Sequence, residues 1–562
     1  MNGNSDAIGK RIRRNGVVGA RWGAALLALS VGLGCATEDG DDDEGDPRAE
    51  LPIDANVDGV GTVGLRRLTV REYNATVRDL LGEGAAPSAR FLPEDRRTPF
   101  DNDFTTQTAS RVLVEGVEAL ARDIAARTVA DPARRDLVVG CAPSSADDDD
   151  CMRSFVTAQG RRMLRRPLTA EEVDAFTRLG LDAAAQTEFF GGVEAVLTAW
   201  LQDPAFLYRI ETGVPVPGRP GLFRLDGFEV ATRMAYLIWG SAPDDGLLDW
   251  AESGGLDEAE GRREAATAML ADPRARGQID RFHAQWLGYD SLSHPPFLTN
   301  AMRLETRALV ERVIFDEHAA WDQLFLSTDS YIGPTLASYY GIAEPITELG
   351  WVDTSAVDRV GILSQGSFLS VAPNVDDTSP TKRGKVVRER LMCQPIPPPP
   401  PDVMADTPPT PTDSSCRLDE YRAHREQGTC AGCHALMDEV GFGLERYDAV
   451  GVYREFEYLP EGLESNEACA IEGKGEIVGV GTFEGPAGLG RLLVDEGIVQ
   501  PCVVQQLYGY AMGHAVDDAD EPMLQRLQAD FAASDYRFDE LVLALVADEA
   551  FAYRQELDPE GN

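Results

Sequence analysis

Apolar residues recur at helical spacing over much of the chain, whereas alternating patterns are rare. An apolar side chain at every third or fourth position marks the segments 109–127, 256–287, 304–325, 521–534 and 537–554. Strand signals are few and short, as at 350–352 and 477–483. The pattern predicts a mainly α fold made of several small helical domains with few short strands.

Three segments carry the signature of a helix N-terminus. Residues 69–72 (TVRE) and 169–172 (TAEE) place a threonine three positions before a glutamate, and 226–229 (DGFE) repeats the pattern with aspartate. In such a capping box the first side chain accepts a hydrogen bond from a backbone N–H of the first turn, and the glutamate bonds back to the cap. Each segment therefore predicts the start of a helix.

Two distant segments resemble each other. Residues 196–211 (VLTAWLQDPAFLYRIE) and 541–556 (LVLALVADEAFAYRQE) share Ala, Asp, Ala, Phe, Tyr, Arg and Glu at a constant offset. Two interpretations remain open: a recurrent way of ending a helix with aromatic packing, or a duplicated helical unit. Two copies do not make a solenoid.

The N-terminus resembles an export signal. Five basic residues precede position 22, and residues 23–34 are an apolar run too short to span a membrane comfortably. Cys35 follows at once, as at a bacterial lipoprotein processing site, where the cysteine becomes the lipidated first residue; Gly32 stands where leucine is usual. A lipoprotein is the preferred interpretation, with plain secretion and an uncleaved anchor as alternatives. The acidic residues that follow predict a solvated tether.

The charge of the chain is strongly negative. Its 562 residues carry a formal net charge of −42, which argues against binding to nucleic acid or to anionic lipid through long-range attraction. A basic redox partner would be attracted, although the acidity can also serve solubility alone. The apolar fraction of 43% is enough for real cores.

The clearest chemical motif is Cys-Ala-Gly-Cys-His at residues 430–434. In C-x-x-C-H the two thiols add to the vinyl groups of haem, and the adjacent histidine becomes the proximal iron ligand. A zinc site would require a second pair of ligands at similar spacing, and a redox dithiol normally lies in a thioredoxin-like βαβ context. Neither accompanies the motif. We therefore expect one covalent haem c held by Cys430, Cys433 and His434.

The sixth iron ligand is open. Met437 follows His434 by one helical turn and is on the same side of the iron, whereas His424 precedes the motif and could fold back. The other candidates, in the Pro-rich segment and far downstream, are Met404, Met512 and His514. An empty sixth position would shift the chemistry from electron transfer toward ligand binding or catalysis.

The nine cysteines fit an exported protein. With Cys35 assigned to lipid and the C-x-x-C pair to haem, six remain, and an oxidising compartment favours disulfides among them. Pairing of sequence neighbours gives Cys141–Cys151, Cys393–Cys416 and Cys469–Cys502. Six cysteines allow fifteen connectivities, so only Cys141–Cys151, which closes a short polar loop, is well founded.

The main basic cluster precedes the haem motif. Its members are Lys382, Arg383, Lys385, Arg388 and Arg390, followed by the proline run 397–401. These side chains could face haem propionates or a partner, or form a solvated helix face. The prolines predict a short polyproline II linker.

With these motifs in view, the chain resembles the planctomycete-type multidomain cytochrome c proteins, which also occur in myxobacteria. The resemblance rests on the segments 65–82, 99–104, 151–176, 196–211, 224–248, 361–403, 430–454 and 499–554. It implies several domains of unknown function around one haem motif. Two departures are Asp438-Glu439, where the family carries Asp-Pro, and Met512, which often is leucine there.

The expected organisation follows from the motifs and the resemblance. It is a signal peptide with a lipidated cysteine (1–35), an acidic tether (36–60), an N-terminal helical domain (61–130), a disulfide-containing helical domain (138–186), a central helical domain (187–330), a cytochrome c-like haem domain with its linker (355–456) and a C-terminal helical domain (475–556).

The preferred function is electron transfer to or from an unknown partner by a protein of the cell envelope. It would lie in the periplasm or at the outer membrane, held by its N-terminal lipid. An enzyme is one alternative: a haem-dependent oxidoreductase acting on an extracellular substrate, which the size of the chain favours. The other is a structural surface lipoprotein without a redox role.

Overall fold

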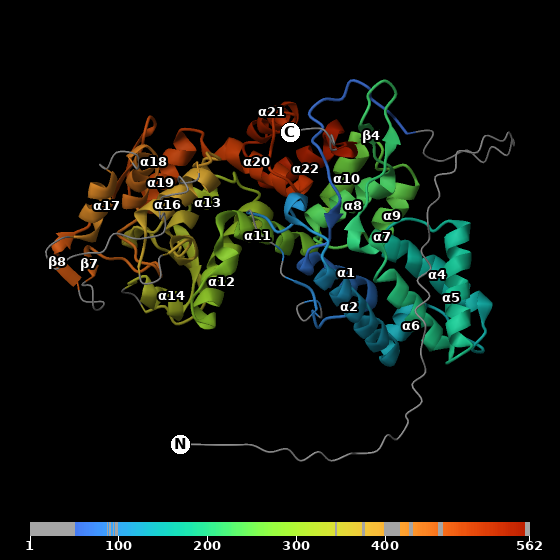
Figure 1. Ribbon diagram of the computed structural model, residues 1–562. Helices are drawn as coiled ribbons and strands as arrows, with labels where there is room; N and C mark the ends of the chain where they lie inside the picture. The colour runs from blue at the N-terminus through green and yellow to red at the C-terminus, as the bar shows by residue number, and fades with distance from the viewer. Residues whose placement is uncertain are drawn as a thin grey trace, which may run out of the picture. The chain divides into compact units, whose positions relative to one another are not determined.

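The protein is mainly α-helical, as the apolar pattern predicts. A computed structural model describes residues 51–556 except 87, 89–90, 94, 96–98, 343–344, 374–376, 398–415, 426–430 and 459–464. These residues belong to one compact unit. They form 22 α-helices, and their strands are short and lie in sheets of two or three strands (Figure 1).

The N-terminal helices share one core. They are α1 (Val70–Leu81), α2 (Arg111–Ala130), α3 (Pro132–Val139), α4 (Asp149–Leu164), α5 (Ala170–Ala184) and α6 (Phe189–Trp200). Leu120, Phe155 and Trp200 are fully buried between them. Thr69 and Thr169 cap α1 and α5 with both hydrogen bonds of a capping box, as the sequence predicts.

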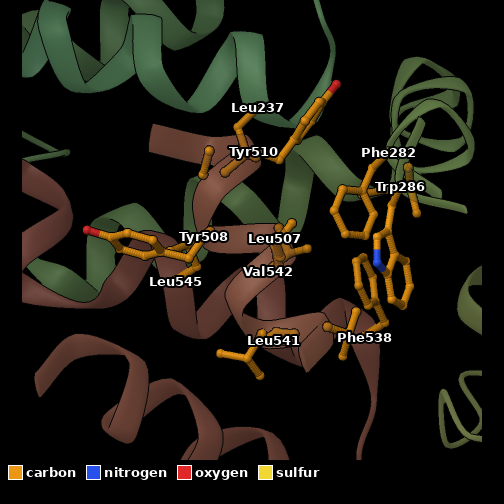
Figure 2. Close-up of a cluster of buried hydrophobic side chains, with 14 of the residues drawn as sticks. Leu237, Phe282, Trp286, Leu507, Tyr508, Tyr510, Phe538, Leu541, Val542 and Leu545 are labelled. Carbon is orange, nitrogen blue, oxygen red and sulfur yellow. The ribbon is translucent and has the colours of Figure 1, made fainter. Parts of the chain in front are cut away.

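A second core joins the central helices to the C-terminal ones. The central helices are α8 (Gly227–Ile238), α9 (Asp245–Glu252), α10 (Ala259–Leu270) and α11 (Pro273–Leu287); the C-terminal ones are α20 (Val499–Met512), α21 (Glu521–Ala533) and α22 (Phe538–Ala547). Figure 2 shows Phe282 and Trp286 of α11 beside Phe538 of α22. The central and C-terminal parts of the described chain therefore fold together around one core.

The segment 304–325 is not one helix. It begins within α12 (Pro296–Glu311), continues as a π-helical turn (Arg312–Asp316) and ends at His318, whose φ of 46° is left-handed. The short elements that follow are α13 (Gln323–Leu326), β5 (Asp329–Ile332), α14 (Pro334–Tyr339), β6 (Gly350–Asp353) and α15 (Gly366–Leu369). β5 and β6 pair antiparallel.

The two similar segments form the same structural unit. The first runs from α6 through α7 (Pro204–Leu207) to β2 (Tyr208–Arg209), and the second from α22 through a 3-10 turn (Glu549–Ala552) to β11 (Tyr553–Gln555). Asp203 Oδ1 accepts the N–H of Ala205 at 2.8 Å, and Asp548 Oδ1 accepts that of Ala550 at 2.9 Å.

The partner strands of this unit repeat as well. β1 (Arg66–Arg67) pairs antiparallel with β2, and β4 (Leu222–Arg224) pairs antiparallel with β11 and β3 (Val214–Pro215). The residue after each partner strand also donates its backbone N–H. Leu68, after β1, donates to the carbonyl oxygen of Leu207, and Leu225, after β4, donates to that of Ala552. Capping boxes begin α1 and α8 immediately afterwards. The sequence similarity therefore marks a structural repeat of two segments each.

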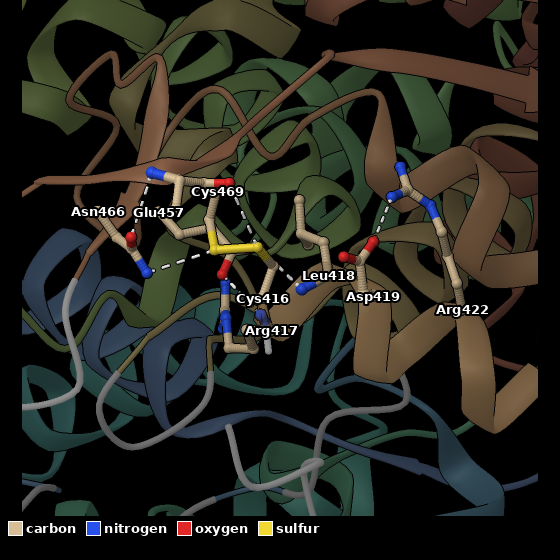
Figure 3. The surroundings of a disulfide bond; sticks show 9 residues. Cys416, Arg417, Leu418, Asp419, Arg422, Glu457, Asn466 and Cys469 are labelled. Atoms are coloured by element: carbon tan, nitrogen blue, oxygen red, sulfur yellow. Dashed lines mark hydrogen bonds and ion pairs between the residues drawn. A yellow bond between two sulfur atoms is a disulfide. The ribbon is translucent and has the colours of Figure 1, made fainter. Parts of the chain in front are cut away.

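The predicted disulfides need one correction. Cys141 pairs with Cys151 as expected, but Cys393 pairs with Cys502 and Cys416 with Cys469, so the predicted pairs Cys393–Cys416 and Cys469–Cys502 are wrong. Sequence neighbours are not spatial neighbours here. Cys416 precedes α17 (Arg417–Arg425) and is joined to β8 (Ser465–Ala470), as Figure 3 shows, whereas Cys393 faces α20.

Candidate haem site

One helix carries the described part of the C-x-x-C-H motif. α18 (Ala431–Phe442) contains Cys433 and His434, and Cys430 immediately precedes it, outside the described residues. Cys433 is partly exposed and has a free thiol, so it belongs to no disulfide. The three disulfides use the six other cysteines between residues 141 and 502, which leaves the motif cysteine available for other chemistry.

A buried carboxylate orients the histidine. Nδ1 of His434 lies 2.9 Å from Oδ2 of Asp438, one helical turn further along α18, and the Asp438 side chain is fully buried. The hydrogen bond from Nδ1–H to this carboxylate raises the pKa of His434. Because the carboxylate accepts, the proton is on Nδ1 and the lone pair is on Nε2. This is the tautomer in which carboxylate-bound histidines ligate metals.

Asp438 is itself held from a second helix. Oγ1 of Thr381, on α16 (Pro380–Val386), donates to Oδ1 of Asp438 at 2.7 Å. Both carboxylate oxygens of Asp438 therefore have a named partner, and the chain Thr381–Asp438–His434 fixes the imidazole ring. Neither Thr381 nor Asp438 was predicted from the sequence as a functional residue. The i, i+4 spacing of His434 and Asp438 on a helix was the available signal.

Two glycines let α16 and α18 cross closely. A Cβ on Gly384 would lie 1.8 Å from the carbonyl oxygen of Met437, and one on Gly441 would lie 1.8 Å from that of Pro380. Such distances exclude any side chain, so the two backbones are in direct contact. This crossing brings Thr381 within hydrogen-bond distance of Asp438.

The basic cluster does not form a single surface. Arg383 is buried and donates to the carbonyl oxygens of Leu369, Leu444, Tyr447 and Asp448 and to the Glu445 carboxylate. Arg388 is also buried and donates to Leu436 O on α18, whereas Lys385 is exposed. Arg383 thus belongs neither to a solvated face nor to a binding patch; it holds the turn after α18 in place.

Glu445 is the centre of the surrounding ion-pair network. Its buried carboxylate is within 3.3 Å of guanidinium nitrogens of Arg383, Arg417 and Arg454. Arg417 begins α17, and Glu457 of β7 (Phe456–Tyr458) accepts the backbone N–H of Arg417 and Leu418 (Figure 3). The network fastens α16, α17 and the strands β7 and β8 around α18. β9 (Lys474–Ile477), β10 (Gly481–Glu484) and α19 (Gly485–Asp495) complete the region.

The candidates for the sixth ligand are scattered. Met437 is buried on α18, and Met512 is buried in the core that α20 shares with the central helices. His514 packs between the rings of Phe104 and Tyr508 and faces an acidic cluster. Met404 and the side chain of His424 lie outside the described residues. The sixth ligand stays a prediction.

Other predictions also fall outside the described part of the chain. Residues 1–50 are not described, so this applies to the signal peptide, to Cys35 and to most of the tether. Within the described ranges, none of the helices combines the length and apolar character that crossing a bilayer requires.

The helical fold and the motif on α18 define a multidomain protein with one candidate haem helix. Models of five protein families match it in order, each described as a protein of unknown function: DUF1587 at 66–130, DUF1595 at 151–211, DUF1592 at 225–342, DUF1588 (PSCyt3) at 359–457 and DUF1585 at 481–551. The chain therefore carries five domains of the planctomycete cytochrome c-associated type, as the resemblance predicts. No curated protein and no solved structure matches it.

Proposed function

We propose that this protein is an exported, lipid-anchored c-type cytochrome with one covalent haem. Cys430 and Cys433 would form the thioether bonds, and His434 would ligate the iron through Nε2. The protein would pass electrons to or from a partner protein, and its many acidic side chains would attract a basic one.

The proposal rests on the arrangement of Cys433 and His434 on α18. A free thiol at Cys433 is next to a histidine whose Nδ1 is tied to the buried Asp438 carboxylate. A histidine held in this way presents one defined nitrogen to a metal in a fixed direction. Thiol and imidazole on consecutive residues suit covalent attachment and iron ligation of the same group.

Haem would supply an iron that cycles between two oxidation states, and the residues around it would set its potential. Asp438 withdraws the Nδ1 proton toward itself and makes the imidazole a stronger electron donor. Thr381 keeps the Asp438 carboxylate in position, and the glycine-mediated crossing keeps Thr381 in position. These contacts would prevent the ring from rotating when the charge of the iron changes.

Export is supported by the cysteine chemistry. Three disulfides among the described residues are typical of an oxidising compartment and rare in the cytosol. The apolar run at 23–34 followed by Cys35 would direct export and lipid attachment. We therefore place the protein in the cell envelope, in the periplasm or at the outer membrane.

A pyridine haemochrome spectrum tests the cofactor. The full chain is produced with cytochrome c maturation machinery, beside the double variant Cys430→Ser, Cys433→Ser. The matched control is Cys141→Ser, Cys151→Ser, which also removes two thiols but lies far from α18 in sequence. We expect the band of covalent haem c in the wild type and the control only. Its absence from the wild type would overturn the proposal.

A second experiment tests the anchor. Wild type and Cys35→Ser are expressed in a bacterium with a lipoprotein pathway and partitioned with a detergent that separates on warming. We expect the wild type in the detergent phase and the variant in the aqueous phase. Equal partitioning of the two would reject lipid attachment at Cys35 without bearing on the haem.

A further inference from the structure

Far along the sequence from α18, three metal-ligating side chains converge. One ring nitrogen of His514 and one carboxylate oxygen from each of Asp517 and Asp520 all lie within 4.8 Å of one another. His514 follows the left-handed Gly513 that ends α20, and Asp520 is the residue before α21. Asp517 is exposed, which leaves a path for an ion and for water.

His514 has an unprotonated ring nitrogen that is free to ligate a metal. Its Nδ1 is 2.7 Å from the carbonyl oxygen of Ala515, and a carbonyl can only accept, so Nδ1 carries the proton and Nε2 the lone pair. Nε2 is buried and has no hydrogen-bond partner, in a side chain belonging to a residue only 8% exposed. A buried acceptor without a donor is unfavourable, because it has lost its hydrogen bonds to water without gaining others. A cation at this position would satisfy it.

Gly61 leaves a small space beside Nε2 of His514. A Cβ on Gly61 would lie 2.3 Å from Oδ1 of Asp520, 2.5 Å from the Tyr508 hydroxyl and 3.3 Å from Nε2 of His514. These three atoms therefore surround the small space that glycine leaves at position 61. The Tyr508 hydroxyl donates to Oδ1 of Asp520 at 2.5 Å and holds that oxygen in place.

The Asp520 side chain bonds within the cluster and not to the helix that follows it. Asp520 occupies the N-cap position of α21, yet its side chain makes no capping hydrogen bond to that helix. Oδ2 instead accepts the N–H of Asp517 at 2.9 Å.

We propose that His514, Asp517 and Asp520 bind a divalent transition-metal ion of the Zn²⁺ class. One imidazole and two carboxylates favour such an ion over Ca²⁺ or Mg²⁺, which prefer all-oxygen shells. Ligand bonds of about 2.1 Å require donor atoms about 3–4 Å apart, so the cluster needs to contract by less than about 1.5 Å. Water would complete the shell on the exposed side. The ion would tie the end of α20 to the start of α21.

Zinc binding to the purified full chain tests the site independently of haem, because the readout is zinc rather than iron. The protein is stripped with a chelator, equilibrated with Zn²⁺ by dialysis and analysed for bound zinc. The variants are His514→Gln and Asp517→Asn. The control is His318→Gln, because His318 is an exposed histidine outside the cluster whose Nδ1 is 2.9 Å from the Asp539 carboxylate.

We expect wild type and His318→Gln to bind one Zn²⁺ more than His514→Gln, and excess Ca²⁺ not to displace it. Asp517→Asn, an exposed change that leaves the core intact, should weaken this binding by about tenfold or more. Equal zinc content in wild type and His514→Gln would overturn the proposal. If His514→Gln fails to fold, unchanged affinity in Asp517→Asn overturns it instead.

Discussion

Nδ1 of His434 lies 2.9 Å from Oδ2 of the fully buried Asp438, one turn along the same helix. The pair places a carboxylate directly behind the imidazole of the C-x-x-C-H motif, which we propose as the iron ligand. A carboxylate in this position makes the ring a stronger donor than a carbonyl would. If α18 holds haem as proposed, this hydrogen bond would stabilise oxidised iron.

Asp438→Asn should raise the reduction potential of the bound haem. A charged hydrogen-bond acceptor on His434 is worth about 1 kcal/mol more than a neutral one, and for one electron this is about 40 mV. The measurement is a spectroscopic redox titration. Glu439→Gln is the control, since it removes a charge at the next position but not the hydrogen bond to His434. A shift of equal size in both variants would assign the effect to net charge alone.

Gly441→Ala should destabilise the crossing of α16 and α18. The added methyl would lie 1.8 Å from the carbonyl oxygen of Pro380, which a backbone cannot avoid without moving. We expect a loss of about 1–3 kcal/mol in the free energy of unfolding, measured by urea denaturation, and reduced haem incorporation.

The control for this change is on the same helix. A Cβ on Gly432 would meet nothing within 4 Å, and Gly432 is in the first turn of α18, so Gly432→Ala should raise the free energy of unfolding by less than about 1 kcal/mol. A destabilisation of similar size in both variants would mean that the close crossing is not what Gly441 provides.

The disulfides close loops of very different length, which predicts a difference in how much each contributes to stability. Cys393–Cys502 closes a sequence separation of 109 residues and Cys141–Cys151 one of 10. Chain entropy assigns about 4–5 kcal/mol to a loop near 100 residues and about 3 kcal/mol to a loop near 15. Replacing both cysteines by serine should therefore lower the urea midpoint more for the first pair. Peptide mapping without reduction checks the pairing itself, and recovery of Cys393 linked to Cys416 would contradict it.

Local patterns predicted much of this fold because they describe contacts between near neighbours. The boxes at Thr69, Thr169 and Asp226 all cap helices with both hydrogen bonds in place. The similarity of 196–211 and 541–556 also reflects a real repeat. Each copy of the repeat also contains a second segment, residues 66–72 in one copy and 223–229 in the other. From the sequence these segments are recognisable only as capping boxes, because the strands with which they pair are distant in sequence.

The features that sequence reasoning missed depend on tertiary contacts. Arg383 belongs to a run of basic residues, which favours a solvated face, but the folded chain offers it a set of carbonyl oxygens and Glu445. The partners of Cys393 and Cys416 are more than 50 residues away in sequence. Asp438 gains its role from burial under α16, which no spacing rule states.

A buried glutamate on α12 should make the stability of the fold depend on pH. Glu305 is fully buried, and its two carboxylate oxygens accept hydrogen bonds from the hydroxyls of Ser330 and Tyr340. Burial outweighs these hydrogen bonds and raises the pKa of Glu305 to about 7 from an ordinary 4.5. Between these two values the folded protein keeps a proton that the unfolded chain has released.

The folded state should therefore lose stability as the pH rises through this window. The pKa difference corresponds to about 3 kcal/mol, present in full below the lower pKa and gone above the higher one. Urea unfolding at about pH 5 and about pH 8 measures it. In Glu305→Gln the side chain cannot ionise, so the difference between the two pH values should shrink by about that amount. Glu115→Gln, at an exposed surface pair, should behave as wild type. If Glu305→Gln keeps the full pH dependence, Glu305 is ionised in the folded protein at neutral pH.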